Sequence, residues 1–345
     1  MILPEKILDT VQLEELLTDP SPALTALMRR LSGDIMILGG SGKMGVSMAL
    51  LAVNAVRAAA VDRKILVAAR FSNPAVRAKL DRAGVETIVC DFLDRATVSR
   101  LPRVPNIIFM AGRKFGTEGC EELTWAVNIL APAFVAEHFK ESRIVAFSTG
   151  CVYPLVDAAS GGCTEAVAPE PVGEYSQSCL GRERILQYAA RQYGTRMLLF
   201  RLNYAIDLRY GVLHDIAMPI WRGEKVNNAV SHFNAIWQSS ANEAALRALE
   251  LADNPPAILN VTGPETVSTM DVAEEFGRLF GKKVEYLHPV PGRRCYLNNA
   301  AKMHVLFGLP AVSMAQMIRW QAAWIANGGA SLNKPTHFEV SDGRF

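Results

Sequence analysis

The sequence predicts an α/β fold, in which helices cover both faces of a doubly wound parallel sheet. Three observations predict it. Short apolar runs alternate with amphipathic, helix-like stretches between residues 34 and 202, the runs contain few polar residues, and a glycine-rich turn joins the first run to the first helix. Uninterrupted apolar runs are typical of strands buried on both faces, and their alternation with helices indicates right-handed βαβ units.

Six strands are expected in this region, and each is four or five residues long. They lie at 35–38, 65–69, 86–90, 106–110, 143–147 and 197–200. The first helix is expected at 46–60, directly after the glycine-rich turn. Together they predict residues 34–202 to be the main domain.

The segments on either side follow different patterns. Residues 1–33 predict a helical extension that Pro20 and Pro22 interrupt. After Leu202 the alternation stops, so we expect residues 203–327 to form a smaller mixed region, interleaved with the sheet, that binds the substrate. The polar residues 328–345 predict a C-terminal surface tail.

Composition excludes several classes of protein. The net charge of +2 is too small, and the basic residues too scattered, for a nucleic-acid or membrane-surface protein. The apolar runs are too short to cross a bilayer, and the N-terminus does not resemble a secretory signal, so a cytoplasmic protein is expected. The six cysteines and six histidines are dispersed, which predicts reduced thiols and no metal site.

The glycine-rich turn spans residues 39–45, with glycine at 39, 42 and 45 and Lys43 and Met44 between the last two. Glycines between a strand and a helix let the backbone approach a pyrophosphate, which the helix N-terminus then binds. This predicts a Rossmann fold that holds a dinucleotide at Gly39, Gly42, Lys43, Met44 and Gly45. A P-loop is excluded, because Ile37 replaces its first glycine and Met44 its Ser/Thr.

The end of the second strand bears on the choice of cofactor. Arg70 stands where NAD enzymes place a carboxylate for the ribose 2′-hydroxyl, and an arginine suits a 2′-phosphate. Lys43 could add to the same charge. The sequence therefore favours NADP over NAD.

From residue 34 to residue 325 the chain resembles the extended short-chain dehydrogenase/reductases, the family of NAD-dependent epimerases and dehydratases. The resemblance rests on the three glycines, on the segments 91–94 and 110–112, on 148–154, which resembles S-[ST]-x-x-V-Y-G, and on 174–183, which resembles Y-x-x-S-K-x-x-x-E. It implies catalytic roles for Asn128, Thr149 and Tyr175. It also implies cofactor contacts at Asp91, Phe92, Ala111, Gly112, Tyr175 and Leu202.

One departure from the family pattern affects catalysis. The family has a lysine four residues after the tyrosine, and this chain has Cys179. Without a nearby cation, a tyrosine is a weak base at neutral pH. Arg182, on the same helical face, is our candidate for restoring the charge. Cys179 is expected to be an inert thiol, because no histidine lies nearby in the sequence to activate it.

The resemblance also narrows the substrate. Gly150 and Cys151 cannot supply the acidic pair of the dehydratases, and residues 231–240 lack the arginine and aspartate usual in sugar-nucleotide epimerases. A small sugar-like or carbonyl substrate is therefore expected. The candidate substrate contacts are Arg113, Asn203, His214, Trp237 and Arg294, although Trp237 also suits the core.

Two functions remain open at this point. One is an NAD(P)-dependent oxidoreductase or epimerase, in which Thr149 and Tyr175 hold the reacting oxygen. The other is a dinucleotide-binding sensor or scaffold without turnover, which the missing lysine favours. The resemblance also implies a homodimer.

Overall fold

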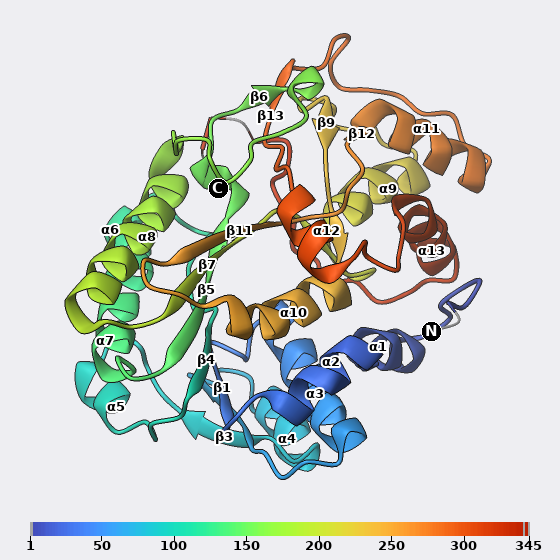
Figure 1. Ribbon diagram of the computed structural model, residues 1–345. Coiled ribbons are helices and arrows are strands. Elements are labelled where there is room, and N and C mark those ends of the chain that lie inside the picture. The colour runs from blue at the N-terminus through green and yellow to red at the C-terminus, as the bar shows by residue number, and fades with distance from the viewer. Residues whose placement is uncertain (1–2, 341, 344–345) are drawn as a thin grey trace.

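The computed structural model describes residues 3–340 and 342–343. Its centre is a sheet of seven parallel strands in the order β11-β7-β5-β4-β1-β2-β3 (Figure 1). The strands are β1 (Ile35–Leu38), β2 (Ile65–Ala69), β3 (Glu86–Val89), β4 (Asn106–Phe109), β5 (Arg143–Thr149), β7 (Met197–Leu202) and β11 (Ala257–Val261). The order runs outward in both directions from β1 and β4, so the sheet is doubly wound, as predicted.

Helices cover both faces of this sheet. They are α3 (Lys43–Ala59), α4 (Pro74–Arg82), α5 (Arg95–Ser99), α6 (Glu121–Trp125), the π-helical turn η1 (Ala126–Leu130), α7 (Ala131–His138), α8 (Gly173–Tyr193) and α10 (Gln238–Arg247). Ile35 and Ile37 pack on the side of α3 and α10, whereas Met36 and Leu38 pack on the side of α7 and α8. Successive strand residues point to opposite faces, which explains the continuous apolar runs in the sequence.

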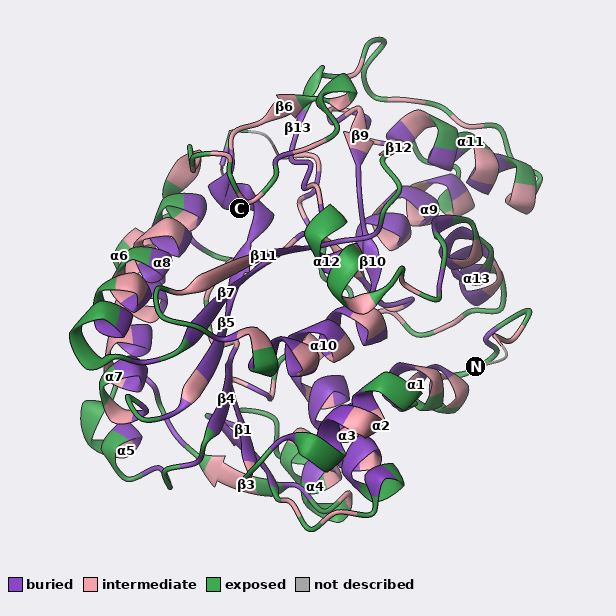
Figure 2. Cartoon of the chain, in the orientation of Figure 1, coloured by how far each residue is buried: buried purple, intermediate pink, exposed green. Residues whose placement is uncertain are grey.

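Burial follows the same arrangement (Figure 2). The strands in the middle of the sheet are buried, whereas the edge strand β3 is only partly covered. None of the helices in the described part of the chain is long and apolar enough to cross a membrane.

A second hydrophobic core lies beside the sheet. Its helices are α9 (Val212–Arg222), α11 (Thr269–Phe280) and α13 (Met314–Ala326), with α12 (Ala301–Phe307) at the edge of β11. Short strands join this part to the rest: β6 (Val156–Asp157), β8 (Ala205–Ile206), β9 (His232–Phe233), β10 (Ile236–Trp237), β12 (Val267–Ser268) and β13 (Arg294–Cys295). Single 3-10 turns occur at η2 (Gly150–Val152), η3 (Ala158–Ser160) and η4 (Ala248–Leu251).

The N-terminal extension consists of α1 (Thr10–Thr18) and α2 (Pro22–Arg30). Asp9 and Ser21 cap the two helices by accepting hydrogen bonds from backbone N–H groups, and Pro22 is the first residue of α2. Leu13 and Leu17 of α1 enter the second core, while α2 packs on α3. The extension therefore bridges the two cores.

Two expectations about the later part of the chain need correction. The strands of the sheet do not end at Leu202, because β11 adds a seventh strand parallel to β7 after α9 and α10. This strand agrees with the expectation that residues 203–327 are interleaved with the sheet. The expected surface tail is correct only in part, because residues 328–335 are mostly exposed but the segment that follows them is partly buried. Thr336 and Phe338 are each 3% exposed, and the carbonyl of Gly343 lies against Gly173 at the start of α8. The polar composition of this segment hides its burial in the sequence, because its buried polar groups are hydrogen-bonded to other parts of the protein.

A buried ion pair joins α8 to the sheet. Arg201 of β7 donates to both oxygens of Glu183, at 2.9 and 2.6 Å, and Ser148 of β5 donates to the same carboxylate at 2.6 Å. Both charged side chains are at most 3% exposed. The pair therefore fixes the helix that carries Tyr175 against two strands.

Replacing Glu183 with alanine is expected to destabilise the protein by roughly 3–5 kcal/mol, because it leaves the Arg201 guanidinium buried without its anion. Urea denaturation followed by circular dichroism measures the change. Glu275→Ala is the matched control, since Glu275 makes the same two-bond contact with Arg278 on the surface of α11 and its loss is expected to change stability little. Equal effects of the two substitutions would contradict the conclusion that the buried ion pair holds α8 against the sheet.

Candidate functional site

The glycine-rich turn lies where β1 ends and α3 begins. At Gly39, φ is +89° and a Cβ would lie 2.6 Å from the backbone nitrogen of Ala111, while at Gly45 it would lie 2.5 Å from the Cα of Gly40. Side chains are therefore excluded at both positions. At Gly42, the N-cap of α3, the nearest atom to a Cβ would be 3.7 Å away. The space at this helix N-terminus is open, which fits the diphosphate of a dinucleotide.

Two cavities, each of about 330 Å³, meet at this turn. The central cavity lies between the turn, the end of β5, α8 and the segment after β7. The side cavity lies between the turn and the ends of β2 and β3. Five residues line both: Gly39, Gly42, Met110, Gly112 and Arg113. The two cavities form one groove across the carboxyl edge of the sheet, where doubly wound folds bind their ligands.

Several of the predicted cofactor contacts line this groove. Arg70, Asp91, Phe92 and Ala111 line the side cavity, and Lys43, Met44, Gly45, Tyr175 and Leu202 line the central cavity. Arg70 follows the last residue of β2 and is exposed. Lys43 lines the central cavity instead, where its Nζ lies 3.1 Å from the centre of the Tyr210 ring, so it does not join Arg70 in the 2′-phosphate site that the sequence suggested.

Thr149 and Tyr175 face each other in the central cavity. Thr149 ends β5 and its hydroxyl accepts a hydrogen bond from the backbone N–H of Cys151 at 3.2 Å, while Tyr175 lies in the first turn of α8. The two hydroxyls are hydrogen-bonded. Burial raises the pKa of Tyr175 well above 10, and the neighbouring Cys179 and Cys151 add to the rise. Tyr175 is therefore a protonated phenol at neutral pH.

Arg182 occupies the interior rather than the surface. It is 5% exposed and lines the central cavity, and its Nη1 donates to the carbonyl of Phe147 at 2.9 Å. Its positive charge opposes the rise in the pKa of Tyr175. The arginine thus supplies the cation that position 179 does not.

Asn128 connects the elements around this arginine. It is fully buried in η1, and its side-chain oxygen accepts hydrogen bonds from Nη2 of Arg182 and from the backbone N–H of Arg113 at 3.0 Å. Its amide donates to the carbonyl of Arg113 at 3.0 Å and to Ser178 at 2.9 Å. A Cβ at Gly112 would lie 2.5 Å from Nη2 of Arg182, so a larger residue there would displace the guanidinium. Asn128 therefore positions Arg182 and the loop after β4.

Cys179 is buried beside Tyr175, and burial raises the pKa of its thiol to about 11. The charge of Arg182 lowers that pKa without offsetting the effect of burial. The thiol is thus protonated at neutral pH, as expected for an inert cysteine.

Sequence reasoning missed several residues of the central cavity, among them Lys114, Phe115, Tyr210 and Thr336. Lys114 follows the turn after β4 and donates to the carbonyl of Thr336 at 3.1 Å, and its Nζ lies 5.8 Å from the centre of the Tyr175 ring. Tyr210 lines the cavity from the segment after β8. The A-G-R-K sequence after β4 could have indicated Lys114, but Thr336 and Tyr210 are brought in by long-range folding alone.

Among the predicted substrate contacts, Arg113 and Asn203 line the central cavity, and three others do not. Trp237 is 1% exposed and packs edge-to-face on Trp320 in the second core. His214 lies beside Asp215 in a separate depression, and Arg294 is exposed on β13. None of these three side chains reaches the central cavity, and Trp237 takes the core position that the sequence also allowed. In the part of the chain that the structure describes, no three His, Cys, Asp or Glu side chains gather as metal ligands.

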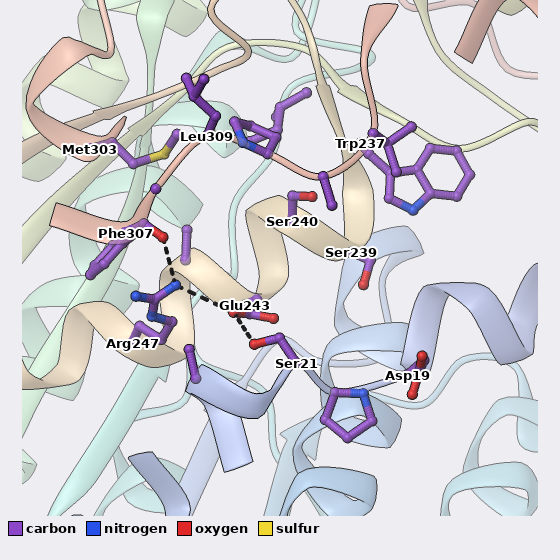
Figure 3. A pocket seen from close by; sticks show the side chains of 18 of the residues that line it. Asp19, Ser21, Trp237, Ser239, Ser240, Glu243, Arg247, Met303, Phe307 and Leu309 are labelled. Carbon is purple, nitrogen blue, oxygen red and sulfur yellow. Dashed lines mark hydrogen bonds and ion pairs between the residues drawn. The ribbon is translucent and has the colours of Figure 1, made fainter. Parts of the chain in front are cut away.

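A separate cavity of about 490 Å³ lies between the start of α2, α10 and the segment after α12 (Figure 3). Its polar side chains bind one another: Ser21 donates to Glu243 at 2.6 Å, and Arg247 lies 3.4 Å from the same carboxylate. Arg247 also donates to the carbonyl of Phe307. These contacts hold the N-terminal extension on α10, so the cavity offers little for chemistry.

Residues 35–205 match the model of the NAD dependent epimerase/dehydratase family. No curated protein matches the sequence. Solved structures of similar fold include UDP-glucose 4-epimerase from Thermotoga maritima with UDP-glucose, which is 17% identical with a TM-score of 0.68 over 86% of this chain and 99% of that one. The Thermus thermophilus UDP-glucose 4-epimerase with NAD is 20% identical, with a TM-score of 0.67 over 84% and 97%.

A third structure of similar fold is dTDP-glucose 4,6-dehydratase from Streptomyces venezuelae with NAD, which is 17% identical with a TM-score of 0.71 over 85% of this chain and 97% of that chain. These similarities confirm the predicted Rossmann-type fold.

The thiol of Cys179 is expected to resist alkylation. At pH 8, three units below its pKa of about 11, only about one thiol in a thousand is a thiolate. Iodoacetamide labelling of the native protein, followed by peptide mass spectrometry, measures the rate. Cys120, which is partly exposed at the start of α6, is the comparison within the same sample. Labelling of Cys179 as fast as Cys120 would show that its thiol is activated.

Proposed function

The chain belongs, through residues 35–205, to the NAD dependent epimerase/dehydratase family, and from that premise we propose that it reduces the carbonyl group of a small sugar-like substrate. The observation that carries the proposal is the protonated phenol of Tyr175, hydrogen-bonded to Thr149 inside the central cavity. A phenol with a raised pKa is a proton donor rather than a base at neutral pH.

The cofactor in this proposal is a nicotinamide dinucleotide that spans the two cavities. The open space at Gly42 and the N-terminus of α3 would hold its diphosphate, and Asp91 and Phe92 would meet its adenosine end. We propose NADP, because Arg70 lines the side cavity at the end of β2. When bound, a reduced nicotinamide supplies the hydride.

The protein's own groups would act on the carbonyl oxygen. Thr149 and Tyr175 both donate hydrogen bonds to it, and the Tyr175 proton moves to this oxygen as the carbonyl carbon accepts the hydride. The charge of Arg182 stabilises the tyrosinate that remains until solvent returns a proton. Epimerisation would have to begin with the reverse reaction, in which Tyr175 removes a proton, and its raised pKa disfavours that step.

The size of the central cavity supports a small substrate. At about 330 Å³ it lies at the lower end of the range for ligand sites. Asn203, which is 3% exposed and bound to Asn234 at 2.6 Å, forms part of its rim after β7. A compact sugar, sugar acid or ketone fits this space better than a sugar nucleotide.

A second candidate function is a dinucleotide-binding sensor without turnover. Cys179 in the position of the family lysine favours it, because the thiol is neutral and cannot stabilise a tyrosinate. The Arg182 guanidinium beside Tyr175 weighs against it. Turnover that depends on Tyr175 separates the two functions.

We also propose a homodimer that pairs through the outer surfaces of α6, η1 and α8. Leu123, Leu130 and Tyr188 are 37%, 49% and 65% exposed on these elements. Light scattering of the purified protein gives the mass.

Tyr175→Phe is expected to lower kcat for carbonyl reduction at least 100-fold and to change NADPH affinity less than threefold, because it removes the proton donor and retains the ring. The contribution of Tyr175 to the reduction rate should not change with pH up to pH 10, because the phenol stays protonated below its raised pKa. NADPH absorbance measures the reduction rate and its dependence on pH, and nicotinamide fluorescence measures the affinity for NADPH. Tyr193→Phe, at the exposed end of α8, is the control. Unchanged turnover in Tyr175→Phe would exclude this mechanism.

Arg70→Ala is expected to weaken NADPH binding about tenfold and to leave NADH binding nearly unchanged, because only NADPH carries the 2′-phosphate. Nicotinamide fluorescence titration measures both affinities. Arg77→Ala tests the general effect of removing a nearby surface charge, since Arg77 lies on α4 and bonds to Thr87. A protein that binds NADH more tightly than NADPH before any substitution would contradict the NADP assignment.

A further inference from the structure

The central cavity carries an excess of positive charge. Lys43, Arg113, Lys114 and Arg182 line it, and none of its described lining residues is Asp or Glu. Arg182 is bound by Asn128 and Phe147. The remaining three cations are close to the space in which a substrate would lie. A cavity lined by positive charges attracts negatively charged ligands.

Lys43 is the most unusual of the three. Its Nζ is shielded from solvent and has no hydrogen-bond partner among the described residues. It lies 3.1 Å from the centre of the Tyr210 ring and 5.1 Å from that of Phe115. Aromatic faces attract an ammonium, but they do not replace the acceptors that it loses from water. Burial, together with Lys334 and Lys114, lowers the pKa of Lys43 to about 8.

The other cations approach the same point. The Nζ of Lys114 lies 5.4 Å from the centre of the Phe115 ring, so one ring lies near both ammonium groups. Burial lowers the pKa of Lys114 as well. The Nε of Arg113 is also buried with no hydrogen-bond partner in the described part of the chain, although its Nη2 donates to the carbonyl of Gly116.

The two carboxylates near Lys43 are hydrogen-bonded to other groups. Asp207 accepts two hydrogen bonds from the Arg209 guanidinium, at 2.9 and 2.6 Å. One oxygen of Asp215 accepts from the N–H and hydroxyl groups of Thr336, at 2.7 and 2.6 Å. Both carboxylates attract Lys43 from a distance, but its pKa still falls. The protein thus keeps a buried cation without a direct anionic partner.

We propose that Lys43 binds an oxyanion of the substrate, a carboxylate or a phosphate, between Phe115 and Tyr210, with Lys114 and Arg113 alongside it. The substrate is then an acidic or phosphorylated sugar rather than a neutral one. This inference rests on the proposed function, because it assigns the substrate class of the same cavity. The diphosphate of the cofactor has its own donors in the backbone N–H groups that start α3, so this proposal moves Lys43 from the predicted cofactor contacts to the substrate contacts.

The test measures ligand binding by calorimetry, with the protein saturated with NADP. The probes are gluconate, glucuronate, glucose 6-phosphate and inorganic phosphate, with glucose and glucitol as neutral counterparts. At least one acidic sugar is expected to bind ten times more tightly than its neutral counterpart. Carboxylate and phosphate probes show which oxyanion the cavity prefers.

Lys43→Met is expected to weaken acid binding at least tenfold and to change NADP affinity less than twofold. Lys283→Met, on the surface, is the control. Acid affinity should fall as pH rises through about 8, because Lys43 loses its proton there and the complex needs the charged form. Lys43→Arg should retain the affinity and lose this pH dependence.

Three results would overturn the inference. The first is that neutral sugars bind as tightly as acidic ones. The second is that no acidic probe binds to the NADP-loaded protein. The third is that Lys43→Met weakens NADP and acid binding equally, which would assign Lys43 to the cofactor phosphates. Failure of the proposed function has a different signature, since the protein would then bind neither NADP nor NAD, or would bind one of them without any turnover that depends on Tyr175.

Discussion

The contact between Arg182 and Asn128 holds the site together. It joins α8 to the π-helical turn η1, and through Asn128 it fixes both backbone groups of Arg113 in the loop after β4. The same guanidinium binds the end of β5 through Phe147. A buried guanidinium needs every one of these acceptors, because an unpaired charge in the interior is costly. Its requirements therefore dictate how three neighbouring elements meet at the cavity.

The position of this charge affects the chemistry. A lysine at position 179 would lie one turn after Tyr175 on the same helix, whereas Arg182 approaches from the next turn and is restrained by its partners. Burial then dominates, and the pKa of Tyr175 remains above its ordinary value despite the nearby cation. Tyr175 therefore stays in the protonated form at neutral pH, and the tyrosinate that could accept a proton is scarcely populated. This protonation state fits the carbonyl reduction that we propose, in which Tyr175 supplies the proton.

The sequence predicted local features well and long-range ones poorly. The glycine turn, β1 and β2 follow from apolar runs and steric limits that act over a few residues, and the bounds of the two strands were correct. The helix after the turn begins at Lys43, three residues before its predicted start. The strand β11 was missed because some fifty residues separate it from β7, which it pairs with. Trp237 is equally suited to a core and to a sugar ring, and only the position of Trp320 decides between them. Helical spacing could place Arg182 near Tyr175 but could not bury it.

The C-terminal segment shows why the remainder of the site was not predictable. Thr336 is held by Asp215 of α9, and its carbonyl in turn holds Lys114, so the last residues close the cavity over a lysine from the loop after β4. Each of these contacts spans more than a hundred residues and uses polar groups that look solvated in the sequence. Closure excludes water from Lys114 and Lys43, and lost hydration lowers the pKa of both amines. The same closure therefore accounts for the enclosure of the cavity and for the burial of its positive charges. A ligand with negative charge would offset the free-energy cost of keeping these charges away from water.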